Sequence, residues 1–267
     1  MTLWDTHCHL HAPEYAGAHA DLLARAREHG IQGIVAVGCD PATNRATLAL
    51  ARQHPAMIRS AVGLHPEWAH PPGAVPALAA QVRGHRPLVV AIGEVGLPWY
   101  RLGDGPVTEE GRRLAEGVLR ACLRLAERAD LPALLHAPHG AASRALELLR
   151  EQGIARAVFH WHKASPEVTQ AIVGAGYFVS VTPELLYRER DRELVRSVPL
   201  TALLVETDGP WPFAQAFGAQ RTEPWMVERV VEAIAAVKGV PLPEVRAELA
   251  ANLRRLFGPA VLGPEGC

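Results

Sequence analysis

The sequence contains few cysteines, and they form no recognisable set. There are four in 267 residues, all far apart and without a CxxC pair: Cys8, Cys39, Cys122 and Cys267. A disulfide framework or a structural zinc knuckle is therefore not expected, and a reducing compartment fits this usage. The N-terminal residues also lack the basic start and apolar core of a signal peptide, and no apolar run is long enough to span a membrane. These absences predict a cytoplasmic protein that makes no membrane contact.

The chain also lacks an excess of charge of one sign. Its formal net charge is −1 at pH 7, so no global positive field draws it toward nucleic acid or anionic lipid. Arginines do gather in one short segment, at Arg188, Arg190, Arg192 and Arg196. We interpret this segment as a solvated helix face, with a local basic groove as the alternative.

Short apolar runs alternate with helical patterns along the whole chain. The runs cover residues 2–5, 33–37, 58–62, 88–92, 133–135, 157–160, 177–181 and 202–206. Several are apolar throughout, which is typical of parallel strands buried on both faces. The clearest helical pattern covers 108–129, and two more helices are expected at 224–238 and 243–257. The stripe expected to be apolar in the first of these is Leu114, Val118, Ala121, Cys122 and Leu125.

Strands and helices in strict alternation predict an α/β fold. Asp40 and Ser165 each precede a proline, the pattern of a helix N-cap followed by proline at the first helical position. No repeat or linker interrupts the alternation, so residues 1–267 are expected to form a single (β/α)₈ TIM barrel domain. An open doubly wound sheet is the alternative, but it usually carries a glycine-rich loop after its first strand. The loop here is His7-Cys8-His9-Leu10, which favours the barrel.

Metal-binding residue types recur at the C-terminal ends of the expected strands, where barrel active sites are assembled. His7 and His9 follow the first strand, and residues two apart in an extended segment point the same way. Further histidines and carboxylates follow or close the fourth, fifth, sixth and eighth strands, at Glu94, His136, His160 and Asp208. Scattered core histidines would have no reason to gather at one end of the strands.

The number of these residues indicates more than one metal ion. Four histidines and two carboxylates are too many for one tetrahedral ion that keeps an open position. They suit two ions about 3.5–4 Å apart, bridged by a carboxylate. Glu94 is the expected bridge, because it faces in between the two groups of ligands. We expect Asp5 to orient a histidine by a hydrogen bond rather than to bind metal.

The order of these residues resembles the TatD family of metal-dependent deoxyribonucleases, and the likeness spans nearly the whole chain. It is carried by Asp5-Thr6-His7-Cys8-His9-Leu10, Val62-Gly63-Leu64-His65-Pro66, Gly93-Glu94-Val95-Gly96-Leu97, Val158-Phe159-His160 and Glu206-Thr207-Asp208-Gly209-Pro210. Arg221, Glu223-Pro224, Asn252 and Leu256-Phe257 also fit.

The resemblance implies a (β/α)₈ barrel that hydrolyses phosphodiester bonds in DNA with a pair of divalent metals. It implies that one metal is bound by His7, His9 and Asp208, the other by His136 and His160, and that Glu94 bridges them. Asp208 would also help to activate water, and His65 would lie at the rim of the site. Zinc, manganese and magnesium are all open as the two ions.

The residues around this ligand set depart from the family pattern. The family usually has an acidic residue where Pro98 stands, the arginine of a His-x-Arg motif where Pro138 stands, and asparagine where Thr222 stands. Its Cys-Phe-Ser-Gly after the sixth-strand histidine is replaced by Trp161-His162-Lys163-Ala164. The intact ligands favour hydrolase chemistry, and the altered surroundings leave the substrate open.

Four residues are the expected substrate contacts: His65, Trp161, His162 and Lys163. His162 lies two residues after His160, so it is read as an extra ligand, a proton donor or a phosphate contact, or else as an ordinary loop histidine. Lys163 either replaces the missing arginine as an anion contact or is solvated. Trp161, like Trp99, either stacks on a base or sugar or forms a wall of the cleft.

The leading interpretation is therefore a TatD-like hydrolase that cleaves phosphodiester bonds in DNA through a metal-activated water, with Glu94 and Asp208 as catalytic carboxylates. The alternative is a related barrel hydrolase that acts on an ester or amide, of the amidohydrolase or aminoacyl-tRNA deacylase type. A barrel that kept its metals as a binding protein is a third hypothesis. The missing arginine favours the second, because arginine is a natural phosphate partner.

Overall fold

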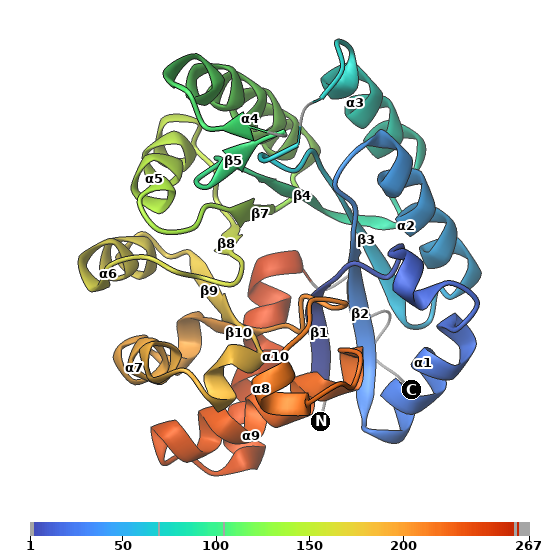
Figure 1. The fold of residues 1–267 in the computed structure, drawn as a ribbon, viewed down its shortest axis with the longest axis vertical. Helices are drawn as coiled ribbons and strands as arrows, with labels where there is room; N and C mark the ends of the chain where they lie inside the picture. The colour runs from blue at the N-terminus through green and yellow to red at the C-terminus, as the bar shows by residue number, and fades with distance from the viewer. Residues whose placement is uncertain (1–2, 69, 104, 259–260, 262–267) are drawn as a thin grey trace.

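Eight parallel strands form the centre of the fold. The structure, a computed structural model, describes residues 3–68, 70–103, 105–258 and 261. The strands lie side by side in the order β1 (Leu3–Cys8), β2 (Ile31–Val37), β3 (Ile58–Val62), β4 (Val89–Gly96), β7 (Ala133–His136), β8 (Ala157–Phe159), β9 (Phe178–Val181) and β10 (Leu203–Val205). They make a nearly closed ring with helices outside it (Figure 1), so the expected (β/α)₈ barrel is confirmed.

The ring closes where the first strand meets the last. Cys8 and Gly209 form an isolated parallel bridge there. The amide of His9 donates to the carbonyl of Gly209 at 2.7 Å, and the amide of Asp208 donates to the carbonyl of His7 at 2.9 Å. The Thr6 hydroxyl adds a bond to the Val205 carbonyl at 2.9 Å. We call this junction of β1 with β10 and the residues after it the seam.

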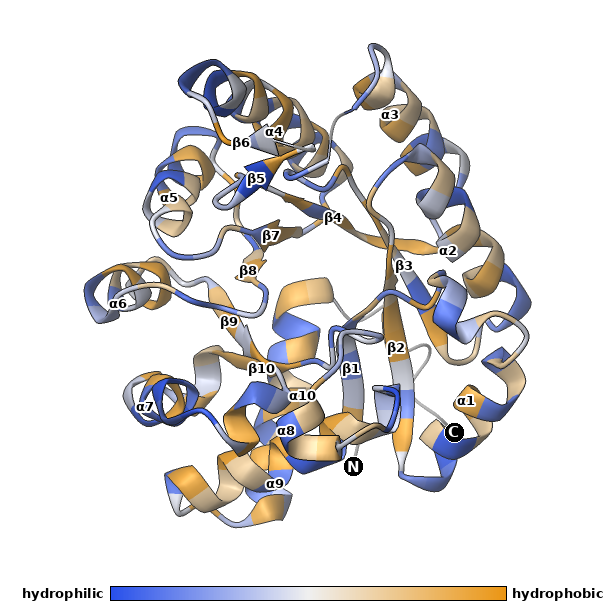
Figure 2. Cartoon of the chain, viewed as in Figure 1, coloured by the Kyte–Doolittle hydropathy of each residue, from blue (hydrophilic) through white to orange (hydrophobic). Residues whose placement is uncertain are grey.

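Helices cover the outside of the ring with their apolar sides turned to the strands (Figure 2). They are α1 (His19–Glu28), α2 (Pro41–Gln53), α3 (Ala74–Gly84), α4 (Glu109–Ala129), α5 (Ala141–Glu151), α6 (Pro166–Gly174), α7 (Glu189–Ser197), α8 (Ala214–Phe217), α9 (Val227–Lys238) and α10 (Leu242–Phe257), with 3₁₀ turns η1 (Pro13–Tyr15), η2 (Pro183–Leu186), η3 (Leu200–Ala202) and η4 (Pro224–Met226). The Asp40 and Ser165 side chains accept bonds from the first turns of α2 and α6, as predicted. The helix expected over 224–238 is divided between η4 and α9.

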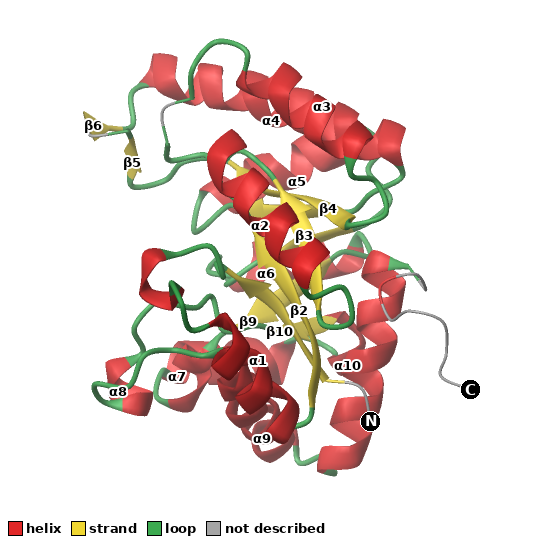
Figure 3. Cartoon of the chain, turned by 90° about the vertical axis from the view of Figure 1, so that its right-hand side faces the viewer, coloured by secondary structure: helices red, strands yellow, loops and turns green. Residues whose placement is uncertain are grey.

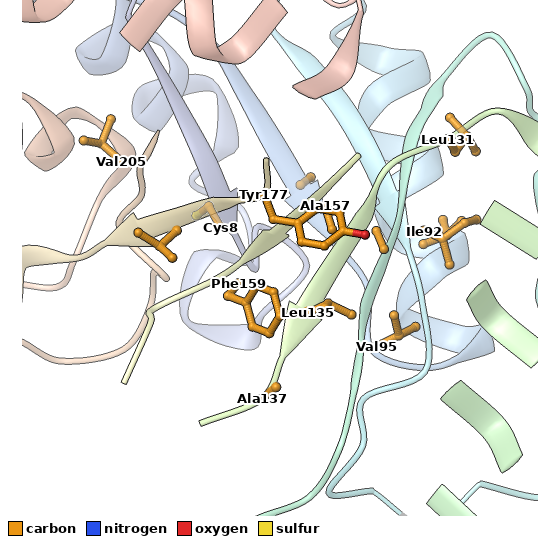
Figure 4. Packing of buried hydrophobic residues seen from close by; sticks show 14 of the residues in the cluster. Cys8, Ile92, Val95, Leu131, Leu135, Ala137, Ala157, Phe159, Tyr177 and Val205 are labelled. Carbon is orange, nitrogen blue, oxygen red and sulfur yellow. The ribbon is translucent and has the colours of Figure 1, made fainter. Parts of the chain in front are cut away.

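Two hydrophobic layers hold the barrel together. Alternate strand residues such as Val35, Leu134 and Leu204 point into the ring and fill it. They cluster with the last turns of α10, which cover the end of the ring away from the metal-binding residue types. The other strand residues belong to a larger core that also contains residues of the outer helices. Figure 4 shows two of these strand residues, Leu135 and Phe159, with their side chains near each other. This alternation is the period of two expected when both faces of a strand are buried.

Two strands extend three or more residues beyond their predicted C-terminal ends. β1 runs to Cys8 and β4 runs to Gly96, so His7 and Glu94 lie within strands and not in the loops after them. Both side chains are fully enclosed, and a polar residue in a buried strand breaks the apolar run by which the strand was recognised.

A small hairpin of β5 (Arg101–Leu102) and β6 (Gly105–Pro106) was not expected at all. It projects beyond the barrel, and α8 lies toward the same end of the molecule (Figure 3).

The structure also bears on the expectations that the cysteines form no disulfide framework and that no segment spans a membrane. Cys8, Cys39 and Cys122 are buried free thiols, and Cys267 lies outside the described residues. Among the helices in the described part of the chain, none is long and apolar enough to cross a membrane.

Candidate metal centre and active-site cleft

The structure brings the six expected metal ligands together at one end of the barrel. Three of them lie at the seam, and the other three belong to or follow three different strands on the other side of the ring. They are His7 in β1, His9 after it, Glu94 in β4, His136 at the end of β7, His160 after β8 and Asp208 after β10. All are buried except His9 and His136, which are half-buried.

Glycines allow the neighbouring strands to approach each other at this place. A Cβ atom on Gly63 would collide with the backbone of Glu94, and one on Gly96 would collide with the carbonyl of His136. These two glycines therefore determine how deeply Glu94 and His136 lie in the barrel mouth.

Glu94 stands between two sets of histidines and turns one carboxylate oxygen to each. Its Oε2 lies 3.5 Å from Nε2 of His7 and 3.6 Å from Nε2 of His9. Its Oε1 lies 2.7 Å from Nδ1 of His136 and 2.7 Å from Nε2 of His160. One carboxylate thus faces two separate pairs of imidazole nitrogens.

Asp208 completes the first set. Its Oδ1 lies 3.5 Å from Nε2 of His7 and 3.3 Å from Nε2 of His9. The backbone at Asp208 is left-handed, with φ of 50°, which turns the carboxylate inward just after β10. We call His7, His9 and Asp208 the first group.

His65 lies near the site as expected, where it joins His136 and His160 in a second group around Glu94. Its Nε2 lies 3.4 Å from Oε1 of Glu94, and its side chain is only 14% exposed. Its ring centroid is 4.6 Å from that of His136. The loop after β3 is drawn in by the amide of His65, which donates to the carbonyl of Cys39 at 2.8 Å.

The donor atoms of these groups fit divalent metal ions. Oε2 of Glu94 and Oδ1 of Asp208 are buried oxygens without a hydrogen-bond partner among the described residues. Buried carboxylate oxygens require a compensating cation or donor. Donors bonded to a tetrahedral ion at about 2.0–2.2 Å lie about 3.3–3.6 Å apart. Both oxygens lie 3.3–3.6 Å from the nitrogens of His7 and His9, so the first group has the spacing of a metal site.

The surroundings keep both carboxylates ionised. Burial by itself raises the pKa of Glu94, but His65, His136 and His160 outweigh it, and the pKa lies well below its usual range. Burial likewise raises the pKa of Asp208, but its contact with His9 and the neighbouring imidazoles lower it on balance. Ionised carboxylates are the form that binds metal.

Outer hydrogen bonds set the orientation of the histidine rings. Nδ1 of His9 lies 3.2 Å from the carbonyl of Val37, and since a carbonyl only accepts, the ring donates there and Nε2 keeps its lone pair for the site. Nδ1 of His160 lies 3.3 Å from Oε1 of Glu206. Metal-binding histidines commonly hold such partners on the nitrogen that faces away from the ion.

Glu206 was missed as a functional residue. It is 1% exposed, and besides facing His160 it accepts bonds from the Trp161 amide at 2.6 Å and from the Ser180 hydroxyl at 2.7 Å. It closes the eighth expected strand, so the strand-end rule that found Asp208 also pointed to it.

Asp5 acts on the backbone and not on a histidine ring. One carboxylate oxygen accepts from the amides of His7 at 3.2 Å and Thr207 at 2.9 Å, and the other accepts from the Thr207 hydroxyl. Asp5 is thus a hydrogen-bond partner of a histidine, as expected, but through the His7 backbone, and it also ties β1 to the segment after β10 across the seam.

Two adjoining cavities open over the cluster. The first has about 360 Å³ and reaches both groups, and the second has about 280 Å³ and lies beside the second group. They share the lining residues Glu67, His136, His160, Trp161 and Trp211. The second is also lined by Tyr100 and Lys163. Trp161 and Lys163 therefore lie in the cleft wall as expected, whereas Glu67, Tyr100 and Trp211, which stand on loops, were missed.

A family model described as TatD related DNase matches residues 4–258. The chain belongs to the TatD family. The human protein named deoxyribonuclease TATDN3 is 31% identical over 268 residues, covering 96% of this chain and 94% of that protein. The 3'-5' ssDNA/RNA exonuclease TatD of Erwinia amylovora is 30% identical over 265 residues, covering 96% of this chain and 100% of that protein.

Solved structures agree with this assignment. The crystal structure of YJJV, a TatD homologue from Escherichia coli K12, superimposes with a TM-score of 0.85 at 27% identity, covering 96% of this chain and 97% of that one. A Haemophilus influenzae relative at 29% identity over 261 residues, covering 96% of this chain and 99% of that protein, is named a metal-dependent hydrolase. This TatD-family chain is thus a metal-dependent hydrolase on a TIM barrel.

His162 does not reach the cleft of this TatD protein. It is buried, and its Nε2 lies 2.8 Å from the Thr169 hydroxyl of α6. The expectation that it contacts substrate assumed an extended chain after His160, in which every second residue faces the same side. Trp161 instead has a left-handed φ of 39°, which turns His162 away toward the helices.

Other departures from the TatD pattern lie in or behind the cleft wall. Pro138 lines the second cavity beside Lys163, and the amide of His139 donates to the carbonyl of Lys163, so the two loops touch. The Thr222 hydroxyl donates to the carbonyl of Trp211 and fixes that loop. The departures from the family pattern therefore lie around the six expected ligands and not among them.

Proposed function

We propose that this single-domain barrel, residues 1–267, is a phosphodiesterase that cleaves DNA from a binuclear metal centre. The observation that carries the proposal is Glu94, whose two carboxylate oxygens face two separate groups of donors. The printed names of the relatives support nucleic acid as the substrate. A cytoplasmic location is part of the same proposal.

The ligand roles follow from the two groups. His7, His9 and Asp208 would hold one divalent ion, and His136 and His160 the other, with His65 as a further donor and Glu94 shared between the two. Imidazole with carboxylate suits zinc and manganese, and magnesium less well. When bound, such ions act as Lewis acids and lower the pKa of a coordinated water to near neutrality.

Side chains of the protein then accept the proton of the attacking water and enclose the substrate. Asp208 is ionised and lines the first cavity, where it can orient the attacking water and accept its proton. Glu206 and Val37 hold the histidine rings in one orientation. Trp161 and Trp211 form the wall that limits the access of bulk water to the scissile group.

The test is hydrolysis of single-stranded DNA by the metal-reconstituted protein. We expect cleavage that a chelator abolishes and that Asp208→Asn lowers by about 10²–10⁴-fold, the range for loss of a general base. Asp21→Asn, an exposed residue of α1, is the matched control and should keep parent activity. An Asp208→Asn variant as fast as the parent would contradict the mechanism.

The alternative function has one observation in its favour. Pro138 replaces the family's arginine, and the first cavity is lined by Glu14 and Glu67, which do not attract phosphate. Silence on DNA together with turnover of an ester and amide panel that includes aminoacyl-tRNA would establish that alternative. Silence on both, in a protein that binds two metals, would indicate a binding protein.

A further inference from the structure

Glu67 is a buried carboxylate of the cleft that belongs to neither group of donors. It follows Pro66 in the loop after β3, its side chain is 10% exposed, and it lines both cavities. A carboxylate removed from water to this extent needs hydrogen-bonding or positively charged partners. The contacts of Glu67 therefore indicate what it does in the site.

His136 turns its two ring nitrogens to two different carboxylates. Its Nδ1 lies 2.7 Å from Oε1 of Glu94 and 3.1 Å from Nε2 of His160, so Nδ1 is the nitrogen that faces the second group. Its Nε2 lies 3.9 Å from Oε1 of Glu67. This Nε2 is buried and has no hydrogen-bond partner among the described residues.

The position of the proton on His136 follows from its proposed role as a ligand. A neutral imidazole that binds an ion through Nδ1 carries its proton on Nε2. A buried N–H group without an acceptor is unfavourable, and the carboxylate of Glu67 can accept this one after a shift of less than about 1 Å. Metal-binding histidines commonly donate their other N–H to such a carboxylate.

Glu67 is also bonded to the hairpin of β5 and β6. Its carbonyl accepts from the amide of Gly103 at 2.7 Å. Its Oε1 accepts from the amide of Tyr100 at 3.4 Å, and its Oε2 lies 3.7 Å from Nε of Arg101. The hairpin forms a two-stranded sheet of its own and projects beyond the barrel (Figure 3). These contacts therefore connect the hairpin to the second group of donors.

The two expected histidine ligands of the second ion are thus supported from different parts of the fold. Nδ1 of His160 lies 3.3 Å from Glu206, which directly follows β10 and belongs to the barrel. Nε2 of His136 faces Glu67, which lies in a loop bonded to the hairpin. The orientation of the His136 ring therefore depends on the hairpin, and that of the His160 ring does not.

We infer that Glu67 is the positioning residue of His136 and that it couples the second metal site to the hairpin. Its carboxylate accepts the Nε2 proton of His136 when Nδ1 binds an ion, while its carbonyl holds the amide of Gly103. Because coupling between two sites is reciprocal, a hairpin in this position favours the second ion, and the second ion orders the hairpin. This inference rests on the proposed binuclear centre.

Zinc binding tests the contact between Glu67 and His136. Glu67→Gln keeps the shape of the side chain but removes its charge, and Glu67→Asp keeps the charge but withdraws it by one methylene group. We expect both variants to bind the second zinc ion more weakly, by about 10–100-fold in Glu67→Gln. The affinity for the first zinc ion should stay that of the parent. Equilibrium dialysis at graded free zinc measures both affinities.

Glu14→Gln is the matched control, because Glu14 is an exposed carboxylate that lines the same first cavity. Loss of negative charge from the cleft would weaken zinc binding in Glu14→Gln as much as in Glu67→Gln, whereas loss of the His136 contact weakens it only in Glu67→Gln. Parent affinity for the second ion in Glu67→Gln, an equal fall in Glu14→Gln, or an equal fall for both ions would overturn the inference and leave the proposed function standing. A parent protein that binds fewer than two ions would overturn both.

Hydrogen exchange tests the link to the hairpin. We expect exchange at the amide of Gly103 to slow as the second zinc ion binds, because this amide donates to the carbonyl of Glu67. In Glu67→Gln the same slowing should need about 10–100-fold more zinc. The amide of His9, which lies in the first group, should respond at the same zinc concentration in both proteins. A Gly103 amide that does not respond in a parent holding two zinc ions would overturn the coupling.

Discussion

Glu206 and Asp208 stand two residues apart after the same strand, and the structure gives them different partners. Asp208 faces His7 and His9 with an oxygen that has no hydrogen-bond partner among the described residues. Glu206 contacts Nδ1 of His160, the ring nitrogen that faces away from Glu94, and also accepts a hydrogen bond from the Trp161 amide. On the proposed function, one short segment therefore supplies both a metal ligand and the support of another ligand.

A variant of Glu206 tests this division of roles. Glu206→Gln keeps the shape but weakens the acceptor that faces His160, so we expect the affinity for the second divalent ion to fall about 10–100-fold, the usual effect of losing such a partner. Metal content after equilibrium dialysis at graded free metal measures it. The control is Glu232→Gln, whose side chain is 43% exposed. Parent affinity in Glu206→Gln would show that the contact does not support the ligand.

At the scale of elements, α2 links the helical layer to the site. The Asn44 side chain of this helix donates to the carbonyl of Gly63 and accepts from its amide, both at 3.0 Å. Gly63 in turn lies against the backbone of Glu94. The start of α2 is fixed by Asp40, whose carboxylate accepts from the amides of Ala42 and Thr43.

The N-cap residue of α2, Asp40, should make the free energy of unfolding depend on pH. Burial alone would raise the pKa of Asp40, but bonds from Thr43 and Ala42 outweigh it and hold the pKa below its usual value. Asp40→Ala should lower the free energy of unfolding by about 1 kcal/mol at pH 7. Because the folded-state pKa is the lower one, this difference is present above the ordinary carboxyl pKa and disappears as the pH falls through the folded value.

Urea unfolding of the parent and Asp40→Ala at a series of pH values measures this prediction. Glu127→Ala, an exposed residue of α4, should differ little from the parent at any pH. A difference for Asp40→Ala that does not change with pH would show that the charge of the cap contributes nothing.

The elements also show where sequence patterns are sufficient and where they fail. The eight strands could be predicted because their apolar runs are buried on both faces, and the strand-end rule then located all six expected ligands. The placement of His162 in the cleft failed because it lies in a loop, where neither a period of two nor a period of 3.6 applies. Two-residue strands such as β5 have no period to detect.

The prediction for Leu114 was wrong for a different reason. This residue belongs to the apolar stripe expected in α4, but it is 65% exposed. The first turns of α4 extend past the barrel, so Leu114 meets Trp68 and Leu102 around a cavity of about 330 Å³ instead of the sheet. Periodicity identifies an apolar face, but not how far along the helix that face has a partner.

For the molecule as a whole, the seam is the place where the barrel depends on side chains. Neighbouring strands elsewhere in the ring share parallel ladders of two or more residue pairs, whereas β1 and β10 are joined by the Cys8–Gly209 bridge and a few single bonds. Asp5 and Thr6 supply side-chain bonds across this junction. The first group of donors straddles it, since His7 and His9 lie on one side and Asp208 on the other.

Metal binding should therefore close the seam more firmly. We expect divalent metal to slow hydrogen exchange at the amides of His9 and Asp208, which donate across the seam, more than at the amides of β3. Global stability should rise by about 2.7 kcal/mol when free metal is 100 times its dissociation constant. Hydrogen exchange with and without chelator measures both regions in one experiment. Equal slowing in β3 and at the seam would show that the ions stabilise the barrel uniformly.

The seam also determines when in its synthesis the protein becomes able to work. Thr6 and Val205, whose bond helps to close it, are 199 residues apart. At about 5–20 residues per second, a ribosome needs roughly 10–40 s to pass from one to the other. Throughout that interval the nascent chain carries His7 and His9 without Asp208, so no partial product holds the complete first group. On the proposed mechanism, the hydrolase therefore stays inactive until Asp208 has been added to the chain.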